Sequence, residues 1–146
     1  MTTDRLANSL SDAAAEALEM SAFMVPTRNL GDEQRAMPLD VAVVVDISGP
    51  RRGRMALAVS RGILAELAAN MLGDDVPLPL DQQRDALGEM LNIICGAFLP
   101  NLEDDDGTYS ISSPRPATFE EESAEGAIVV HFGVEDGRAA LSLRLE

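Results

Sequence analysis

Two runs of alternating apolar residues, separated by a short turn, restrict the possible folds of this chain more than any other feature. The first run covers residues 39–47, and one side of it is entirely apolar: Val41, Val43, Val45 and Ile47. Asp40 and Asp46 fall on the other side. A period of two residues is typical of a β-strand with one buried face. The same period returns after a Gly- and Pro-containing turn at 49–53, in Met55, Leu57 and Val59. The sequence therefore predicts an antiparallel hairpin.

Three other segments have apolar residues recurring every three or four positions, which is the spacing of an amphipathic helix. They span residues 5–24, 61–72 and about 81–99. Residues of ordinary boundary types mark their ends. Ser60 and Asp81 are candidate N-caps, and Gly73 suits the left-handed residue after a helix. Pro26 ends the first helix, and Pro100 kinks or stops the third.

The remaining segments are predicted to be connectors and strands. Residues 29–38 are polar, and Glu103–Gly107 and Glu120–Glu122 are acidic, so all three segments are expected to be exposed connectors. Residues 109–113 are expected to form a short strand closed by two prolines, Pro114 and Pro116. A C-terminal hairpin is expected from residues 127–134 and 139–145, joined by a tight turn at Glu135-Asp136-Gly137.

The order of these elements is helix, hairpin, helix, helix and then about three strands. Consecutive antiparallel strands with grouped helices indicate the α+β class, and the absence of βαβ alternation argues against a doubly wound parallel sheet. We therefore expect a two-layer domain, with a mainly antiparallel sheet of about five to six strands packed against three helices. A length of 146 residues is most simply one domain, residues 1–146.

The charge of the chain excludes several classes of partner. The formal net charge is −14, and all 11 basic residues are arginine. Such an excess of negative charge disfavours binding to nucleic acid or to anionic lipid. A single cysteine excludes an internal disulfide and a cysteine-rich metal site. Because we find neither an apolar run of membrane-spanning length nor a signal-peptide pattern, we expect a cytoplasmic protein that does not enter the membrane.

The third predicted helix carries a polar stripe. At about 100° per residue, and with Asp85 set at zero, Glu89 falls near 40°, Asn92 near −20° and Gly96 near 20°. The large apolar residues lie on the opposite side of this helix. Asparagine and glycine are poor residues for a helix interior, so their place in this stripe is unusual. One interpretation is a contact surface for another molecule. The other is an ordinary solvated face whose glycines, Gly88 and Gly96, are tolerated or packed against a neighbouring strand.

The residues of this helix resemble the signature of the CheC/CheX phosphatase family. The segment reads Asp85-Ala-Leu-Gly-Glu89-Met-Leu-Asn92-Ile-Ile-Cys-Gly96. The family signature has Asp or Ser, Glu four residues later, Asn three residues after that, and Pro a little over twenty residues downstream. Pro114 stands at the last of these places, and the expected order of elements is similar over nearly the whole chain. The resemblance implies a CheX-like domain.

That resemblance also implies an activity. Members of the family remove the phosphoryl group from the aspartyl phosphate of CheY-like response regulators. By motif position, Asn92 would orient the attacking water and Glu89 would dock the regulator's active-site lysine. Asp85 and Gly96 would contact the partner. The resemblance further implies a homodimer and a Mg²⁺ ion held by the regulator, since no metal-ligand set or cofactor motif is visible in this chain.

Three other groups of residues were weighed as sites. Asp12, Glu16 and Glu19 of the first helix repeat the spacing of the motif, but glutamate stands where asparagine is needed. A carboxylate there would repel a phosphoryl group, so a solvated acidic face is expected, and a single site fits the CheX branch. Cys95 falls on the apolar side of its helix and His131 in an apolar strand, so both are expected to be structural.

Two alternatives to a phosphatase follow from the sequence. Pro100 at the end of the motif helix and the strong acidity are also compatible with a non-catalytic CheX-like module that binds a receiver domain or another signalling or motility protein. The other alternative is an unrelated α+β dimeric domain with a coincidental motif, in which an exposed strand edge pairs across a two-fold axis.

Overall fold

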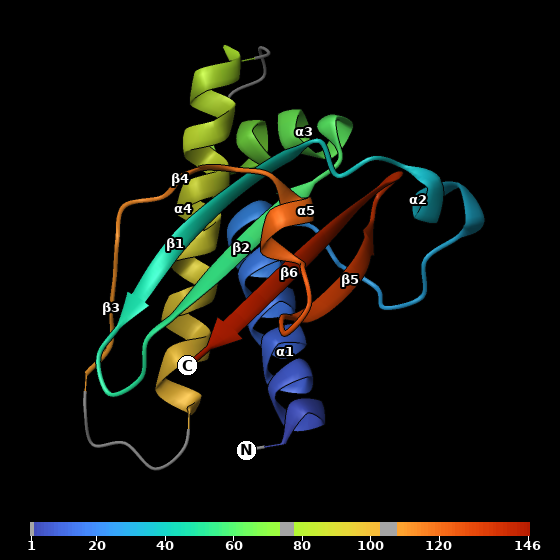
Figure 1. The fold of residues 1–146 in the computed structure, drawn as a ribbon. Helices are drawn as coiled ribbons and strands as arrows, with labels where there is room; N and C mark the ends of the chain where they lie inside the picture. The colour runs from blue at the N-terminus through green and yellow to red at the C-terminus, as the bar shows by residue number, and fades with distance from the viewer. Residues whose placement is uncertain (1, 74–77, 103–107) are drawn as a thin grey trace.

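A computed structural model describes residues 2–73, 78–102 and 108–146 of the chain (Figure 1). Its main helices are α1 (Thr3–Ala22), α3 (Arg61–Leu72) and α4 (Leu80–Phe98), with the 3₁₀ turn η1 (Leu99–Asn101) after α4. Two shorter helices are α2 (Asp32–Ala36) and α5 (Phe119–Glu122). The strands are β1 (Val41–Ser48), β2 (Gly53–Val59), β3 (Ser110–Ile111), β4 (Arg115–Ala117), β5 (Ile128–Val134) and β6 (Gly137–Leu145).

The strands form one antiparallel sheet in the order β3-β1-β2-β6-β5, with β4 also paired to β1. Helices α1, α3 and α4 cover one face of this sheet, and α5 lies over the other face (Figure 1). The α+β class, the two-layer architecture and the three packed helices are therefore confirmed.

Alternation along the strands explains this layering. The apolar residues predicted to share a side of β1 and β2 all belong to the core beneath the helices: Val41, Val43, Val45, Ile47, Met55, Leu57 and Val59. The intervening residues include alanines that are also buried, on the face that α5 partly covers: Ala42, Ala56 and Ala58. Small side chains there allow α5 and its flanking segments to approach the sheet closely.

Several boundary predictions were wrong in detail. Helix α1 ends at Ala22, because Phe23 adopts a left-handed conformation with φ of 55°. Asp81 is not the N-cap of α4. Pro79 holds that position, and Asp81 lies in the first turn, where its Oδ1 accepts a bond from the Gln82 N–H at 3.0 Å. Ser60 does hold the N-cap position of α3, as predicted, but its Oγ accepts from the Arg138 N–H at 3.1 Å and makes no cap bond.

Three segments expected to be connectors or closures contain short regular elements. The polar segment at 29–38 includes α2, and the acidic segment at 120–122 belongs to α5, where Glu122 is buried. Residues 115–117 form β4 on the edge of the sheet, although two prolines flank and enter it. The acidic segment Glu103–Gly107 lies outside the described residues, as do residues 74–77.

Candidate functional site on helix α4

Helix α4 presents the predicted polar stripe to the outside. Asp85, Glu89 and Gly96 are exposed, and Asn92 is half-buried between them. The opposite side of the helix anchors it, because six residues there are completely buried: Leu87, Met90, Leu91, Ile94, Cys95 and Phe98. These side chains fix the rotation of α4 about its axis. The four residues singled out in the sequence therefore share one accessible face, as their angular positions predicted.

The edge strand beside α4 contains a bulge that brings Pro114 to the helix. β1 pairs Val44 with Arg115 and Ile47 with Ile111, so three residues between β3 and β4 face only two residues of β1. The extra residue is characteristic of a β-bulge, a device that bends a strand and redirects a side chain. Ser112 fixes the bulge, since its N–H donates to the Asp46 carbonyl and its Oγ accepts from the Asp46 N–H, both at 2.9 Å.

Pro114 lies directly against Gly88, at the middle of the polar stripe. A methyl group built on Gly88 would stand 2.9 Å from Cβ and 3.1 Å from Cγ of Pro114, which is closer than carbon atoms approach each other. Glycine at position 88 thus allows the proline ring to contact the backbone of α4. This contact places the downstream proline of the signature beside the stripe, one helical turn before Asn92.

The Gly88–Pro114 contact leads to a stability prediction with a matched control. We expect Gly88→Ala to lower the free energy of unfolding by about 1–2 kcal/mol, because overpacking outweighs the intrinsic helix preference of alanine. Gly62 in α3 has no atom within 4 Å of the corresponding methyl position, so Gly62→Ala should raise that free energy by about 0.5 kcal/mol. Urea unfolding of both variants measures whether each substitution raises or lowers the free energy of unfolding. Equal shifts in the same direction would contradict the contact.

Two hollows flank Asn92. One, of about 300 Å³, lies between α4 and the bulge. Its lining residues come from β1, α4 and the segment 114–116: Val43, Asp81, Arg84, Asp85, Gly88, Glu89, Asn92, Pro114, Arg115 and Pro116. The other, of about 380 Å³, lies toward the C-terminal end of α4, where Gly96, Leu99 and Tyr109 contribute to its lining. Asn92 is the residue that lines both. We call the first of these the site hollow.

The carboxamide of Asn92 has an unused hydrogen-bonding group. Its Oδ1 is shielded from solvent and has no hydrogen-bond partner. Among the described residues, only one other buried side chain, that of Arg138, has a polar atom in the same condition, its Nε. An unpaired buried acceptor costs about 1–3 kcal/mol, so this oxygen gains from any molecule that brings a donor to it. A carboxamide also offers two N–H donors at its other end.

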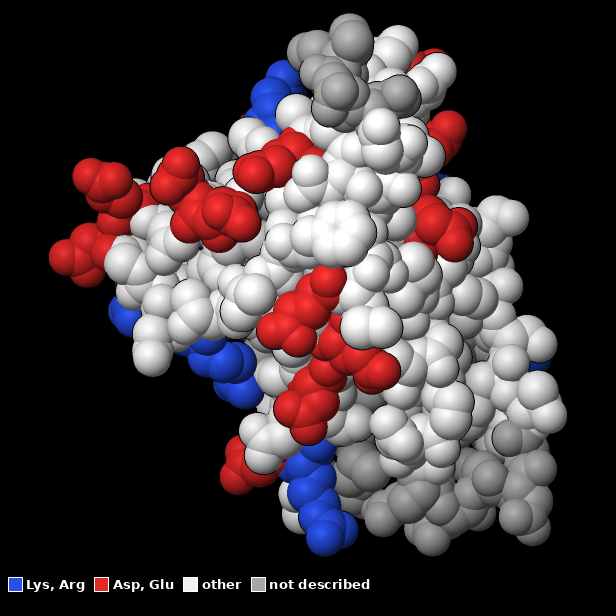
Figure 2. All heavy atoms as spheres, turned by 180° about the vertical axis from the view of Figure 1, so that it is seen from behind, with Lys and Arg blue, Asp and Glu red and all other residues white. Residues whose placement is uncertain are grey.

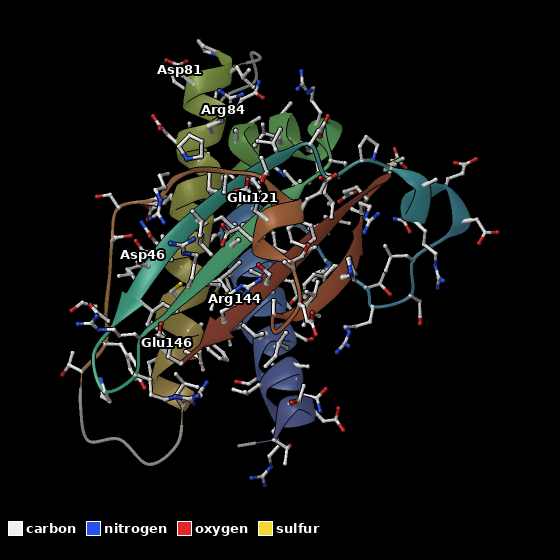
Figure 3. All side chains as sticks on the ribbon, viewed as in Figure 1. Asp46, Asp81, Arg84, Glu121, Arg144 and Glu146 are labelled. Carbon is white, nitrogen blue, oxygen red and sulfur yellow. The ribbon has the colours of Figure 1, made fainter. Side chains whose placement is uncertain are left out.

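Charges of both signs surround the site hollow. The acidic residues Asp81, Asp85 and Glu89 line it along α4, and the basic residues are Arg84 on α4 and Arg115 on β4, whose guanidinium binds Asp46. Figure 3 shows Asp81 and Arg84 at the N-terminal end of α4 and Asp46 on β1. A surface with alternating charges around a neutral carboxamide is suited to a protein partner that carries both an ammonium group and anions.

The second stripe, on α1, is a solvated acidic face. Asp12, Glu16 and Glu19 are all exposed, and no described residue makes an ion pair with them. Figure 2 shows acidic side chains gathered along α1 on this face of the molecule. No pocket among those found in the described structure is lined by these three residues. The polar stripe of α4 therefore differs from that of α1 in lining two hollows.

Cys95 is buried, as expected, whereas His131 is exposed on the sheet. Burial raises the pKa of the Cys95 thiol from 9.0 to about 12, and its Sγ lies 3.7 Å from Sδ of Met55. His131 is on β5, where partial burial and the neighbouring Arg138 lower the pKa of its ring. Its Nδ1 lies 3.0 Å from Nη2 of Arg138, and its ring packs edge-on to Phe119. Neither residue lines the site hollow.

Two general features of the described structure also bear on function. Across residues 2–73, 78–102 and 108–146, no three His, Cys, Asp or Glu side chains come together in a way that could hold a metal ion. No helix in these ranges is both long enough and apolar enough to span a membrane.

The sequence matches the family model for the chemotaxis phosphatase CheX over residues 41–132, which is more than half of its length. The chain belongs to the CheX family. The matched range includes both the polar stripe of α4 and Pro114, so the part of the chain that builds the site hollow is the part that carries the family pattern. No curated protein sequence matches the chain significantly.

Solved structures show the same CheX-family fold. CheX from Desulfovibrio desulfuricans has a TM-score of 0.76 at 20% identity, covering 97% of this chain and 99% of that chain. CheX from Vibrio vulnificus has a TM-score of 0.74 at 20% identity, with 100% and 99% covered. A chain of the CheX–CheY–BeF₃–Mg²⁺ complex from Borrelia burgdorferi has a TM-score of 0.68 at 19% identity, with 95% and 96% covered. At these identities the likeness concerns the fold.

The structure adds residues that sequence reasoning did not include in the site. Arg84 and Arg115 line the site hollow, and Gly88 forms the contact with Pro114. Arg84 was predictable in principle, since it lies one turn before Gly88 on the same helix. Arg115 and the role of Gly88 depend on the bulge, and the periodicity of a three-residue strand between prolines is too short to reveal its register.

Proposed function

We propose that this chain dephosphorylates the aspartyl phosphate of a CheY-like response regulator, with Asn92 orienting the attacking water and Glu89 docking the regulator's lysine. Membership of the CheX family supports a phosphatase acting on CheY in general. The single structural observation that carries the proposal is the position of Asn92. Its carboxamide has an unpaired Oδ1, lies between two hollows, and stands one helical turn from the exposed carboxylate of Glu89.

In the proposed reaction, the main role of this chain is to position the reacting groups. Hydrolysis of an acyl phosphate needs a water molecule in line with the bond that breaks, and stabilisation of the charge on the phosphoryl oxygens. A carboxamide can both donate to and accept from a water without placing a negative charge beside the phosphoryl group. Glu89 on the same face can pair with an ammonium group and hold the partner in one orientation, while Asp85 and Gly96 border the contact.

The partner supplies the remaining groups in this proposal. The regulator provides the phosphorylated aspartate and holds a Mg²⁺ ion, and this chain contributes no metal ligand and binds no cofactor of its own. Because the substrate is a receiver domain of an intracellular signalling pathway, we place the protein in the cytoplasm, with neither nucleic acid nor membrane as a partner.

We also propose that the chain is a homodimer. Strand β5 lies at the end of the sheet, and beyond the bridge between Thr27 and Gly133 its outer edge has no strand partner within the described residues. Two such edges can pair across a two-fold axis and form one continuous sheet. Light scattering should then give twice the monomer mass of 15.6 kDa, and a monomer at micromolar concentration would contradict this part of the proposal.

A turnover experiment tests the phosphatase proposal. A receiver domain from the same organism is phosphorylated with a small phosphodonor and mixed with a substoichiometric amount of the chain, and released phosphate is followed over time. We expect each chain to release many equivalents of phosphate faster than the receiver does alone. No acceleration with any receiver that the chain binds would refute the catalytic claim.

A second function has one observation in its favour. Since Oδ1 of Asn92 is shielded from solvent, the carboxamide must rotate or the surface must adjust before this oxygen can contact a water. A module that binds a receiver without hydrolysing its phosphoryl group would not need that adjustment. Tight binding to a beryllofluoride-activated receiver, together with unchanged phosphate release, would identify the chain as such a non-catalytic module.

A further inference from the structure

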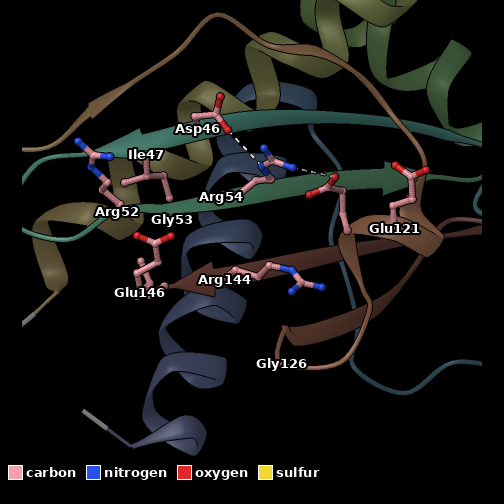
Figure 4. A pocket seen from close by; sticks show the side chains of 11 residues that line it. Asp46, Ile47, Arg52, Gly53, Arg54, Glu121, Gly126, Arg144 and Glu146 are labelled. Carbon is pink, nitrogen blue, oxygen red and sulfur yellow. Dashed lines mark hydrogen bonds and ion pairs between the residues drawn. The ribbon is translucent and has the colours of Figure 1, made fainter.

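A chain of ion pairs connects the site hollow with the opposite face of the sheet. The guanidinium of Arg115 binds the carboxylate of Asp46 through two bonds, Nη1 to Oδ2 at 2.8 Å and Nη2 to Oδ1 at 3.1 Å. The same Oδ1 accepts from Nε of Arg54 at 3.1 Å, and Nη1 of Arg54 lies 3.5 Å from Oε2 of the buried Glu122 on α5. Figure 4 shows Asp46 and Arg54 of this chain, with the bond between them dashed.

These interactions differ from an ordinary surface ion pair. Isolated exposed pairs contribute little to stability, but a two-pronged arginine–carboxylate pair within a network is the exception. The bond from Arg115 holds the pKa of Asp46 below its ordinary value, with a further contribution from Arg54. Asp46 in turn raises the pKa of Arg115. Both side chains are therefore charged at neutral pH.

Strand β4 has few other bonds that could hold it in place. It pairs with β1 through only three residues, and Pro116 among them has no N–H to donate. Pro114, which precedes the strand, also lacks a donor. A short edge strand with two prolines forms a weak ladder. The side chain of Arg115 thus supplies hydrogen bonds that the backbone of this segment does not.

The side chains of Arg115 and Asp46 both project from the outer face of the sheet, because Arg115 is paired with Val44, which shares a side of β1 with Asp46. Arg115 lines the site hollow. Asp46 does not line it, and instead borders the hollow on the opposite face, together with Arg54 and Glu122 (Figure 4). The next residue before Arg115 is Pro114, whose ring contacts Gly88. Any effect of Asp46 on Asn92 must therefore pass through Arg115 and the bulge.

We propose that Arg115 is a positioning residue for the phosphatase site. Held by Asp46, it fixes β4 on the sheet edge, keeps Pro114 against Gly88, and so sets the wall of the site hollow beside Asn92. This inference rests on the proposed function, because it assigns Arg115 a role in the same reaction. Arg115 acts through Pro114 and not by touching the phosphoryl group.

The test uses four single variants of the full chain and the Asp46→Asn/Arg115→Gln double variant. Asp46→Asn and Arg115→Gln each break the two-pronged pair, and Arg115→Lys keeps the charge but cannot form the fork. Arg144→Gln is the control, because it removes an arginine from the same outer hollow, and the side chain of Arg144 makes no hydrogen bond or ion pair with another described residue. Two readouts are taken: single-turnover dephosphorylation, and the NMR signal of the Asn92 side-chain amide in the free protein.

We expect Asp46→Asn and Arg115→Gln each to lower the rate constant at saturation about tenfold, since small misplacements at a reacting centre have effects of this size. The concentration for half-saturation should change less than twofold. The Asp46→Asn/Arg115→Gln double variant should be no slower than Asp46→Asn alone, because each single change already breaks the Arg115–Asp46 pair, and only Asp46→Asn also alters the bond to Arg54. The rate constant of Arg115→Lys should be close to that of Arg115→Gln, and the rate constant of Arg144→Gln should be close to that of the wild type. The NMR signal of the Asn92 side-chain amide should shift in every variant except Arg144→Gln.

Two results would overturn the proposal. One is an Asp46→Asn variant with the wild-type rate constant and an unmoved Asn92 signal. The other is an Arg115→Lys variant that keeps full activity while Arg115→Gln loses it, since this would indicate direct charge contact with the partner. If the wild type dephosphorylates no receiver, the proposed function fails by itself, and the Asn92 signal alone then decides whether Arg115 positions the site.

Discussion

The Asn92→Ala variant is expected to accelerate aspartyl-phosphate hydrolysis at least about 100-fold less than the wild type, while binding an activated receiver with nearly unchanged affinity. Alanine removes the carboxamide that would orient the attacking water, and nothing else in the stripe can replace it, because Asp85 and Glu89 carry negative charge. Alanine also has a higher helix propensity than asparagine, so α4 should remain intact. Phosphate release at saturating chain concentration measures the effect.

Asn101→Ala is the matched control for this variant. Asn101 also carries a carboxamide at the end of the same helical segment, but its Nδ2 donates to the Ala97 carbonyl at 3.0 Å and it lines neither hollow. Its replacement should leave phosphate release unchanged. If Asn92→Ala and Asn101→Ala had the same activity as the wild type, the water-orienting role of Asn92 would be wrong.

The Glu89→Lys variant should weaken binding to an activated receiver by about 100-fold or more. Replacing one member of an interfacial charge pair by a like charge removes an attraction and adds a repulsion, and such changes typically cost several kcal/mol. Glu89 is exposed on the outer face of α4 and lines the site hollow, so its replacement should not disturb the core. Titration of a beryllofluoride-activated receiver, followed by fluorescence or calorimetry, gives the dissociation constants.

Glu16→Lys provides a control with the same change of net charge. Glu16 is an exposed glutamate on α1 and occupies in the second stripe the place that Glu89 has on α4. If binding depends on the docking of a lysine at Glu89, Glu16→Lys should bind within about twofold of the wild type at physiological salt, because distant exposed charges are screened there. Equal losses for the two variants would show that overall charge, and not the α4 stripe, governs association.

The core elements and the polar stripe were predictable because local periodicity encodes them. Alternation in residues 41–47 and 55–59 indicates which side of the hairpin faces the helices, and the same residues form the core there. The angular positions along α4 separated Asn92 from the buried Cys95. When a helix has several turns, or a strand several alternations, the pattern of apolar residues predicts which face of that element is buried.

The wall of the site hollow could not be predicted in this way, because it depends on contacts between segments distant in the chain. The prolines at 114 and 116 were interpreted as the end of a strand, whereas on a sheet edge they are tolerated within one. Glu122 was assigned to an exposed connector, but Arg54 supplies a positive partner that lets it be buried. For Gly88 the sequence allows packing against a neighbouring strand, but the partner, Pro114 at 2.9 Å from the missing methyl group, follows only from the structure.

The acidic stripe on α1 shows why spacing alone does not define such a site. Asp12, Glu16 and Glu19 share the spacing of Asp85, Glu89 and Asn92, yet they line none of the principal hollows of the described structure. In α4 the stripe, the bulge and the ion pairs of Asp46 and Arg115 come together. The proposed activity therefore belongs to the assembly around α4 and not to three residues of a helix.

The central claim is that this assembly hydrolyses the phosphoryl group of a receiver domain, and a single-turnover experiment in ¹⁸O-labelled water tests it most directly. A phosphorylated receiver is mixed with an excess of the chain, and the decay of the acyl phosphate and the label in the phosphate are recorded. We predict that the decay constant rises with chain concentration to a plateau well above that of the receiver alone, and that each phosphate carries one solvent oxygen. A decay constant equal to that of the receiver alone, at concentrations where all of it is bound, would contradict the account.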